Sequence, residues 1–107
     1  MVQKYVKQYS LFEYKGVYRS LADDFGTLAL ESKEKISIAT CLSKPLLQKA
    51  VDNLEKHLLN NGWIESTWPY SKDKAFRNSN NDLEYMSYII KEDFIPEEQA
   101  FNSEQQE

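Results

Sequence analysis

Between positions 43 and 63, apolar side chains recur at intervals of three and four residues. This period predicts an amphipathic helix, because such residues fall on one stripe about a third of the circumference wide. Pro45 suits the first helical turn, and Asn60, Asn61 and Gly62 suit the end. We therefore predict one long helix over about 45–61 that buries the following side chains: Leu47, Ala50, Val51, Leu54 and Leu58.

Before this helix the hydrophobic pattern changes to a period of two, which is typical of strands. Residues 2–9 fit a strand, and 10–21 place Lys15 and Gly16 between two aromatic runs, which predicts a hairpin turn there. In that hairpin Phe12, Tyr14 and Val17 share a face.

Two further features complete the first half of the chain. Asp23, Asp24 and Gly26 predict a turn. Residues 27–42 then alternate on both sides of a charged segment, 31–35, which predicts a second hairpin.

After the helix, alternation resumes over 63–68 and stops at Pro69, which predicts one strand. A long polar loop is expected over 69–82. Residues 83–90 are aromatic and β-branched and predict a last strand.

These elements indicate an α+β fold, a mainly antiparallel sheet of five or six strands with one long helix packed on a face. We expect a single compact domain over 1–91 and a disordered acidic tail over 92–107. The alternative is a winged helix-turn-helix, because a helix that leads into two strands and a polar loop over about 45–90 resembles the recognition helix and wing of that family. Two helices should then precede Ser43, where the sequence alternates with period two.

The net charge of −4 is unevenly distributed along the chain. Residues 92–107 hold six acids and no base, so residues 1–91 hold 13 bases and 11 acids and carry a net charge of +2. Cys41 has no second cysteine to pair with, and no leader or long apolar run is present, so a cytoplasmic location without membrane contact is expected.

Few residues offer catalytic or metal chemistry. His57 is the only histidine and Cys41 the only cysteine, so no closed zinc site can form, and we expect neither a metal nor a cofactor. His57 is expected to be a half-buried helix residue, and Asp23 with Asp24 to be turn residues. No familiar catalytic motif occurs, so we expect a protein that is not an enzyme.

The predicted 69–82 loop and its flanks combine rings, cations and amides, which suits a contact surface. Our first hypothesis is a small non-enzymatic protein-interaction module, an inhibitor, immunity-type protein or adaptor that binds a larger protein. The expected contact residues are Trp68, Tyr70, Lys72, Lys74, Phe76 and Arg77.

A second surface combines rings with basic residues in the first 20 positions, including Phe12, Tyr14 and Tyr18 with Lys15 and Arg19. This combination is also found on nucleic-acid-binding faces. The alternative hypothesis is therefore a nucleic-acid-binding regulator, winged-helix-like or specific for single strands, whose acidic tail competes with phosphate. The pattern leaves undecided whether the protein is a monomer or a dimer.

Overall fold

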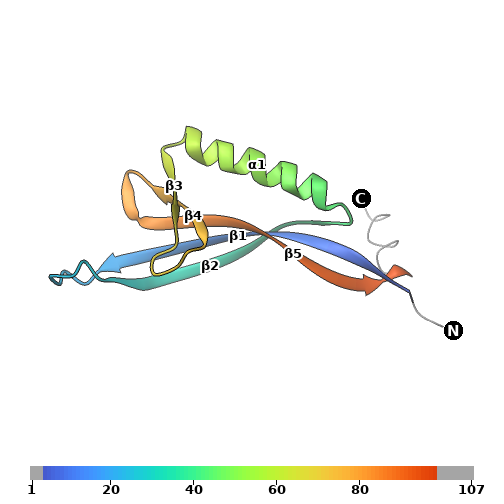
Figure 1. Cartoon of the computed structure of the whole chain (residues 1–107), viewed down its shortest axis with the longest axis horizontal. Helices are drawn as coiled ribbons and strands as arrows, with labels where there is room; N and C mark the ends of the chain where they lie inside the picture. The colour runs from blue at the N-terminus through green and yellow to red at the C-terminus, as the bar shows by residue number, and fades with distance from the viewer. Residues whose placement is uncertain (1–3, 99–107) are drawn as a thin grey trace.

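A computed structural model describes residues 4–98 and shows an α+β fold, in which five antiparallel strands form one sheet and a single helix packs on it (Figure 1). The strand order is β2-β1-β5-β4-β3, so β2 and β3 are the edges. The elements are β1 Tyr5–Ser20, β2 Leu28–Cys41, α1 Lys44–Asn60, β3 Trp63–Thr67, β4 Lys74–Asn78 and β5 Asn81–Pro96. The winged-helix alternative is wrong, because two long strands precede α1 where that family has helices.

The first predicted hairpin is wrong, because β1 runs through Lys15 and Gly16 without a turn. Both neighbours of β1 continue past this point: Gly16 pairs with Lys33 of β2 and with Tyr85 of β5. A strand hydrogen-bonded on both sides holds Gly16 extended, and its weak turn preference is overridden. The chain instead turns at 21–27, as predicted, where the Asp23 carboxylate accepts hydrogen bonds from the backbone N–H of Phe25 and Thr27.

The second predicted hairpin is also wrong, because β2 crosses the charged segment 31–35 as one strand of 14 residues. Its pairing with β1 shifts at two places, between Leu11 and Phe12 and between Val17 and Tyr18. Such bulges bend a strand and increase its twist. The charged side chains are tolerated because β2 is an edge strand with one side in water.

The helix prediction is confirmed: α1 spans Lys44–Asn60 with Pro45 in its first turn. Its Leu47 and Val51 are buried against Leu11 of β1. At ~1.5 to 3 kcal/mol for each buried aliphatic side chain, this stripe is the main term that holds α1 on the sheet. The helix leaves Leu46 and Leu59 exposed.

The predicted 69–82 loop contains a strand, β4, which pairs with β3 on one side and β5 on the other. Ala75 and Phe76 in this strand are almost completely buried. Their burial explains why a segment of polar composition is ordered: two apolar side chains fill a core position in a short central strand. Residues 68–73 remain as the turn between β3 and β4, and Ser79 and Asn80 as the turn between β4 and β5.

Strand β5 extends to Pro96, beyond the expected boundary at Ile90 and into the segment expected to be a disordered tail. Its last residues pair with β1, for example Asp93 with Gln8, and the Glu97 N–H donates to the carbonyl of Lys4. The Lys7 ammonium lies 3.2 Å from the Glu92 carboxylate. Residues 92–96, which include Glu92 and Asp93, are therefore part of the sheet, and the prediction for 99–107 lies outside the described residues.

The strand register defines two faces of the sheet, because side chains alternate along a strand and paired residues share a face. Leu11 pairs with Ile90 and Glu13 with Tyr88 on the face that α1 covers. The other face, here called the outer face, is formed by these residues of the three long strands: Phe12, Tyr14, Gly16, Tyr18, Leu30, Lys33, Lys35, Tyr85, Ser87, Ile89 and Lys91.

Candidate binding face

The six expected contact residues do not form one exposed cluster. Phe76 is 2% exposed and belongs to the core on the helix side of the sheet. The Lys74 ammonium lies over the Phe76 ring and within 3.4 Å of the Glu55 carboxylate of α1 and 3.6 Å of Glu65. These two residues therefore link the β3–β4 hairpin to the helix.

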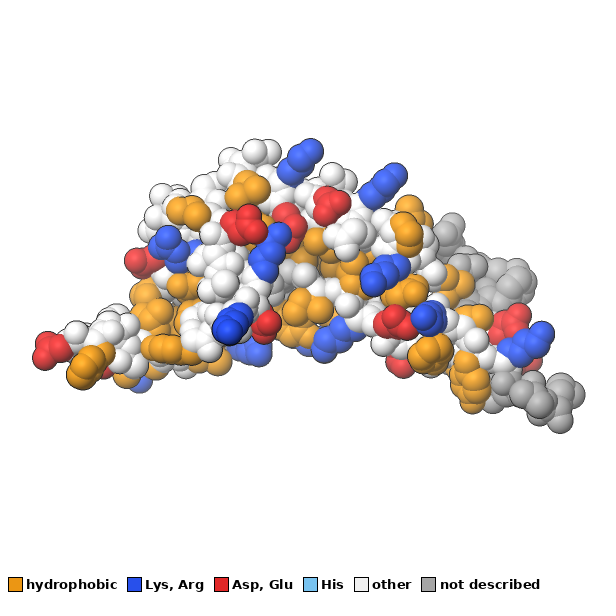
Figure 2. Space-filling view, viewed as in Figure 1, with side chains coloured by type: hydrophobic (Ala, Val, Ile, Leu, Met, Phe, Trp, Pro, Cys, Tyr) orange, Lys and Arg blue, Asp and Glu red, His pale blue; other side chains and the backbone are white. Residues whose placement is uncertain are grey.

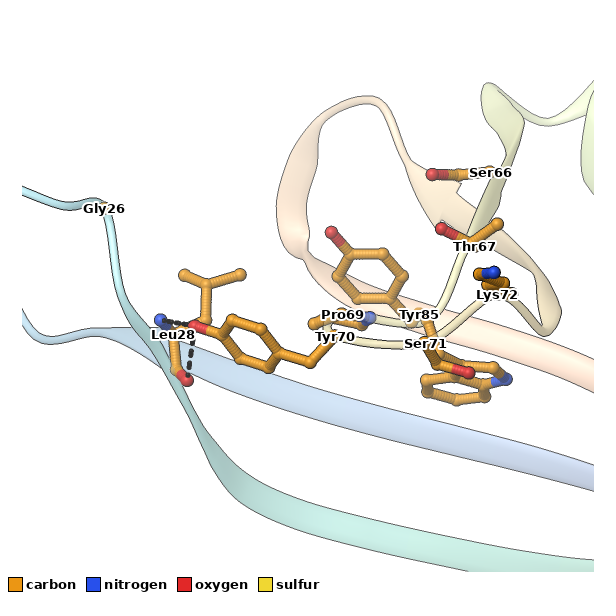
Figure 3. A pocket seen from close by; sticks show the side chains of 10 residues that line it. Gly26, Leu28, Ser66, Thr67, Pro69, Tyr70, Ser71, Lys72 and Tyr85 are labelled. Atoms are coloured by element: carbon orange, nitrogen blue, oxygen red, sulfur yellow. Dashed lines mark hydrogen bonds between the residues drawn. The ribbon is translucent and has the colours of Figure 1, made fainter.

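Trp68 and Tyr70 are also used inside the molecule. The Trp68 indole N–H donates to the Ser87 hydroxyl at 3.2 Å, and its ring lies 6.0 Å from that of Tyr85. The Tyr70 hydroxyl accepts from the Leu28 N–H at 2.8 Å and donates to the Leu28 carbonyl at 3.3 Å, as Figure 3 shows. The 68–73 turn thus reaches across the outer face to the edge strand β2.

The backbone of the turn is closed by its own hydrogen bonds. The Trp68 N–H donates to the Asp73 carbonyl at 3.0 Å, and the Ser71 N–H donates to the Trp68 carbonyl at 3.1 Å. Tyr70 has a φ of 62°, a left-handed conformation that is uncommon for a bulky residue. The two hydrogen bonds to Leu28 offset the free-energy cost of this left-handed conformation.

Of the remaining expected contact residues, Lys72 is exposed on the turn and Arg77 is half-buried in β4.

The structure instead brings rings and cations together on the outer face, beside the turn. The Lys35 ammonium lies 4.3 Å from the Phe12 ring centroid and 5.8 Å from that of Tyr14. The Lys91 ammonium lies 5.7 Å from both centroids, and Lys33 lies 5.9 Å from that of Tyr14. We call this group the lysine-and-ring cluster: Phe12, Tyr14, Lys33, Lys35 and Lys91.

Strand pairing explains why these residues meet. Tyr14 pairs directly with Lys35, and Phe12 lies two residues further along β1. Lys91 pairs with Ser10, diagonally from Phe12. Both rings were expected on a binding face from the sequence, but none of these lysines was, because they come from β2 and β5, far away in the chain. The only local signal was the alternation of charged residues in 31–35.

The positive charge of the cluster lowers the pKa of Tyr14, which is one of its members. The hydrogen bond to the Lys91 ammonium is the main reason that the pKa of the Tyr14 phenol lies below its usual 10.0; burial opposes this shift, and the nearby charge of Lys35 adds to it. The same contact raises the pKa of Lys91. In Figure 2, positively charged and hydrophobic side chains lie side by side along the lower margin, where β1 and β2 run.

A pocket of about 280 Å³ adjoins the cluster. Tyr14, Tyr18, Trp68 and Leu30 form ring and aliphatic walls, and Gly16 lies between them. Lys33, Ser71 and Asp73 supply polar groups. A second, more open hollow of about 650 Å³ lies around Tyr70 and Lys72, where Figure 3 shows Thr67 and Tyr85 as further lining residues.

Cys41 and His57, the two residues with catalytic side chains considered above, lie far apart and do not form a site. Cys41 precedes α1, donates to the Ser43 carbonyl and lies beside the core, whereas His57 is near the far end of the helix. At ~1.5 Å per residue these two side chains are separated by about 20 Å along the helix axis. His57 is exposed, so its expected half-burial is wrong.

Within residues 4–98, no three His, Cys, Asp or Glu side chains are close enough to hold a metal ion. The one helix in that range is too short and too polar to cross a membrane.

Comparison with known proteins gave no relative: no protein-family model matches the chain, and no curated protein and no solved structure matches it significantly.

Proposed function

We propose that this protein is a non-enzymatic binding protein that takes single-stranded nucleic acid on its outer face. The observation that carries the proposal is the lysine-and-ring cluster, in which two aromatic rings lie beneath three lysine ammonium groups on the sheet face away from α1. Sheets that bind single strands present aromatic side chains to the bases and cations to the phosphates.

The geometry of the rings supports stacking. Phe12 and Tyr14 are two residues apart on a central strand, and their centroids are 6.4 Å apart. Both side chains are half-buried, so packing holds each ring in place while part of it remains accessible. Because the bases of a duplex already stack on each other, such rings favour a single strand.

The cations support contact with phosphate. Lys33, Lys35 and Lys91 are all exposed, so each ammonium can leave its ring and follow an incoming phosphate. In the free protein, the electron-rich ring faces keep these like charges together at a modest gain of ~0.5 to 1 kcal/mol each. A phosphate would replace this weak interaction with a charge pair, and a base would take the vacated ring face.

The test is a titration of fluorescein-labelled oligouridylate of roughly 20 nucleotides, and of a duplex of equal length, followed by fluorescence anisotropy. We expect the single strand to bind more tightly. For three phosphates neutralised, the logarithm of the association constant should fall with the logarithm of salt at a slope of about −2.

Matched variants locate the site. Phe12→Leu with Tyr14→Leu keeps apolar contacts but removes the rings, and should weaken binding by ~5-fold or more, since stacking contributes ~1 to 3 kcal/mol per base. Lys35→Gln with Lys91→Gln should weaken binding and flatten the salt slope by about 1.4. The charge-matched control is Lys49→Gln with Lys56→Gln on the exposed side of α1, which should change neither value.

Three results would overturn the proposal. The first is no binding of oligouridylate by the unaltered protein at about 50 mM salt. The second is an equal loss of affinity in the outer-face lysine variant and in the control variant on α1, and the third is binding of poly-glutamate as tight as that of oligouridylate. The last result would identify an acidic protein as the partner of the same face.

A specific observation also favours a protein partner, at another place. Strand β2 is an edge of 14 residues paired only with β1, and it exposes Leu30, Ile36 and Ile38. An unpaired edge of this length is a template for an added strand of another protein. This is the second candidate function, an adaptor or inhibitor that acts by strand addition.

Recovery of the tagged full-length chain from its own cell extract, with and without nuclease, tests this candidate. A protein that remains bound after nuclease treatment and is lost with Ile36→Lys and Ile38→Lys would support strand addition. Retention of the same protein by that variant would contradict it.

A further inference from the structure

We infer that the pocket beside the lysine-and-ring cluster takes one base of the bound strand and selects guanine. This inference rests on the proposed function, because it assigns the base preference of the same outer face. The pocket is continuous with the cluster, since Tyr14 and Lys33 belong to both.

Size and wall chemistry support a single base. The pocket volume is about 280 Å³, just below the ~300 to 1,000 Å³ typical of sites for drug-sized ligands. Its walls include the rings of Tyr14, Tyr18 and Trp68. A flat heterocycle can stack on such rings, and any of the four bases satisfies this requirement.

The rings are held in place from behind. Trp68 is oriented by its hydrogen bond to Ser87, and Tyr18 packs edge-to-face on Tyr85 with centroids 5.4 Å apart. Ser87 and Tyr85 are themselves buried, at 5% and 8% exposure. The walls are therefore preformed, and little side-chain ordering opposes entry of a ligand.

The polar groups of the pocket distinguish guanine from the other bases. Asp73 lines the pocket with an exposed side chain, and no hydrogen bond or ion pair within residues 4–98 occupies its carboxylate. Guanine has two adjacent donors, N1–H and the N2 amino group, that one carboxylate can accept together. Its O6 is an acceptor that the Lys33 ammonium or the Ser71 hydroxyl can serve.

The other bases match this set less well. Cytosine and adenine each offer one amino group beside an acceptor nitrogen, which would face the carboxylate unpaired. Uracil offers a single N–H between two carbonyl oxygens. A base that leaves the Asp73 carboxylate or the Lys33 ammonium without a partner loses charge-assisted hydrogen bonds that guanine makes, which are each worth about tenfold or more in affinity.

The experiment compares two fluorescein-labelled oligouridylates of equal length by anisotropy, one of them carrying a single central guanine. We expect the guanine-containing strand to bind at least about tenfold more tightly. In Asp73→Asn the ratio of the two affinities should fall to about one or two. The control is Asp24→Asn at the 21–27 turn, which makes the same change of charge away from the pocket and should keep the ratio.

The outcomes separate the two proposals. Equal binding of the two strands by the unaltered protein, or an unchanged ratio in Asp73→Asn, would overturn the guanine assignment while oligouridylate binding still supports the proposed function. No binding of either strand would overturn both. Unaltered thermal unfolding of Asp73→Asn shows that a lost preference does not come from loss of the fold.

Discussion

Gly16 and Trp68 are in close contact across the outer face: a Cβ atom added to Gly16 would lie 2.7 Å from Cζ3 of the Trp68 indole. Gly16 is buried within β1, four residues before its end, and Trp68 lies at the start of the 68–73 turn. The missing side chain lets the indole lie against the sheet, where it reaches Ser87. This contact forms one wall of the guanine pocket.

Gly16→Ala should therefore lower the free energy of unfolding by about 1 to 3 kcal/mol, because the methyl group displaces the indole. Urea unfolding measures this loss. The double variant with Trp68→Leu should show a smaller cost of alanine than the single variant, because the overlapping atom is gone. An equal cost in both backgrounds would mean that backbone effects at Gly16, not the indole, account for the loss.

Tyr70→Phe should loosen the turn from β2, because the hydroxyl that bonds both backbone groups of Leu28 is removed. We expect a decrease of about 0.5 to 1.5 kcal/mol in the free energy of unfolding. Amide hydrogen exchange gives a more local readout, since the Leu28 N–H loses its acceptor and should exchange faster. The amides near Asn61 at the end of α1 serve as the control, and uniform acceleration across the chain would contradict a local role.

Phe76→Ala should cost about 3 to 5 kcal/mol of stability, because this ring is buried in β4 and its removal leaves a cavity. Arg77→Ala in the next position is half-buried and should cost less than about 1 kcal/mol. Thermal or urea unfolding of the two variants compares them. Similar stabilities would show that Phe76 does not have the core position described above.

The pKa of Tyr14 provides a test of the cluster without any ligand. In the folded protein it lies below 10.0, mainly because of the Lys91 ammonium, so the phenolate is favoured by folding. This contribution to stability is present above about pH 10 and is lost as the pH falls through the folded pKa. Tyr88 shifts in the opposite direction, because burial and its hydrogen bond to Glu13 raise its pKa.

Ultraviolet absorbance of the phenolates should therefore show one tyrosine that ionises early, Tyr14, and two that ionise late, Tyr88 and Tyr18, whose pKa burial also raises. Tyr14→Phe should remove the earliest step, and Lys91→Gln should move that step to higher pH. An unchanged titration in Lys91→Gln would mean that Lys91 does not contact the phenol.

The local sequence pattern was sufficient to predict an element where the hydrophobic period and the residues at the ends of the segment indicated the same structure. The apolar stripe from Leu47 to Leu58, with Pro45 before it and Gly62 after it, predicted α1 within one residue at each end. The 21–27 turn and the strand 63–67 were found for the same reason, since their turn and proline signals act over a few residues. The α+β fold with a mainly antiparallel sheet followed from these elements.

Packing between distant segments set which alternating segments join into one strand and which side chains meet. Gly16 has the local preference of a turn, but pairing with β2 and β5 holds it in an extended conformation. Because the strand continues through Gly16, Tyr18 lies on the same face as Phe12 and Tyr14. Val17 lies on the opposite face. Lys35 and Lys91 reach those rings only through the register of β2 and β5. The sequence alone determined the helix, the main turn and the fold class, because these depend on neighbouring residues. The binding face depends on contacts between strands distant in the chain, which tertiary packing alone sets.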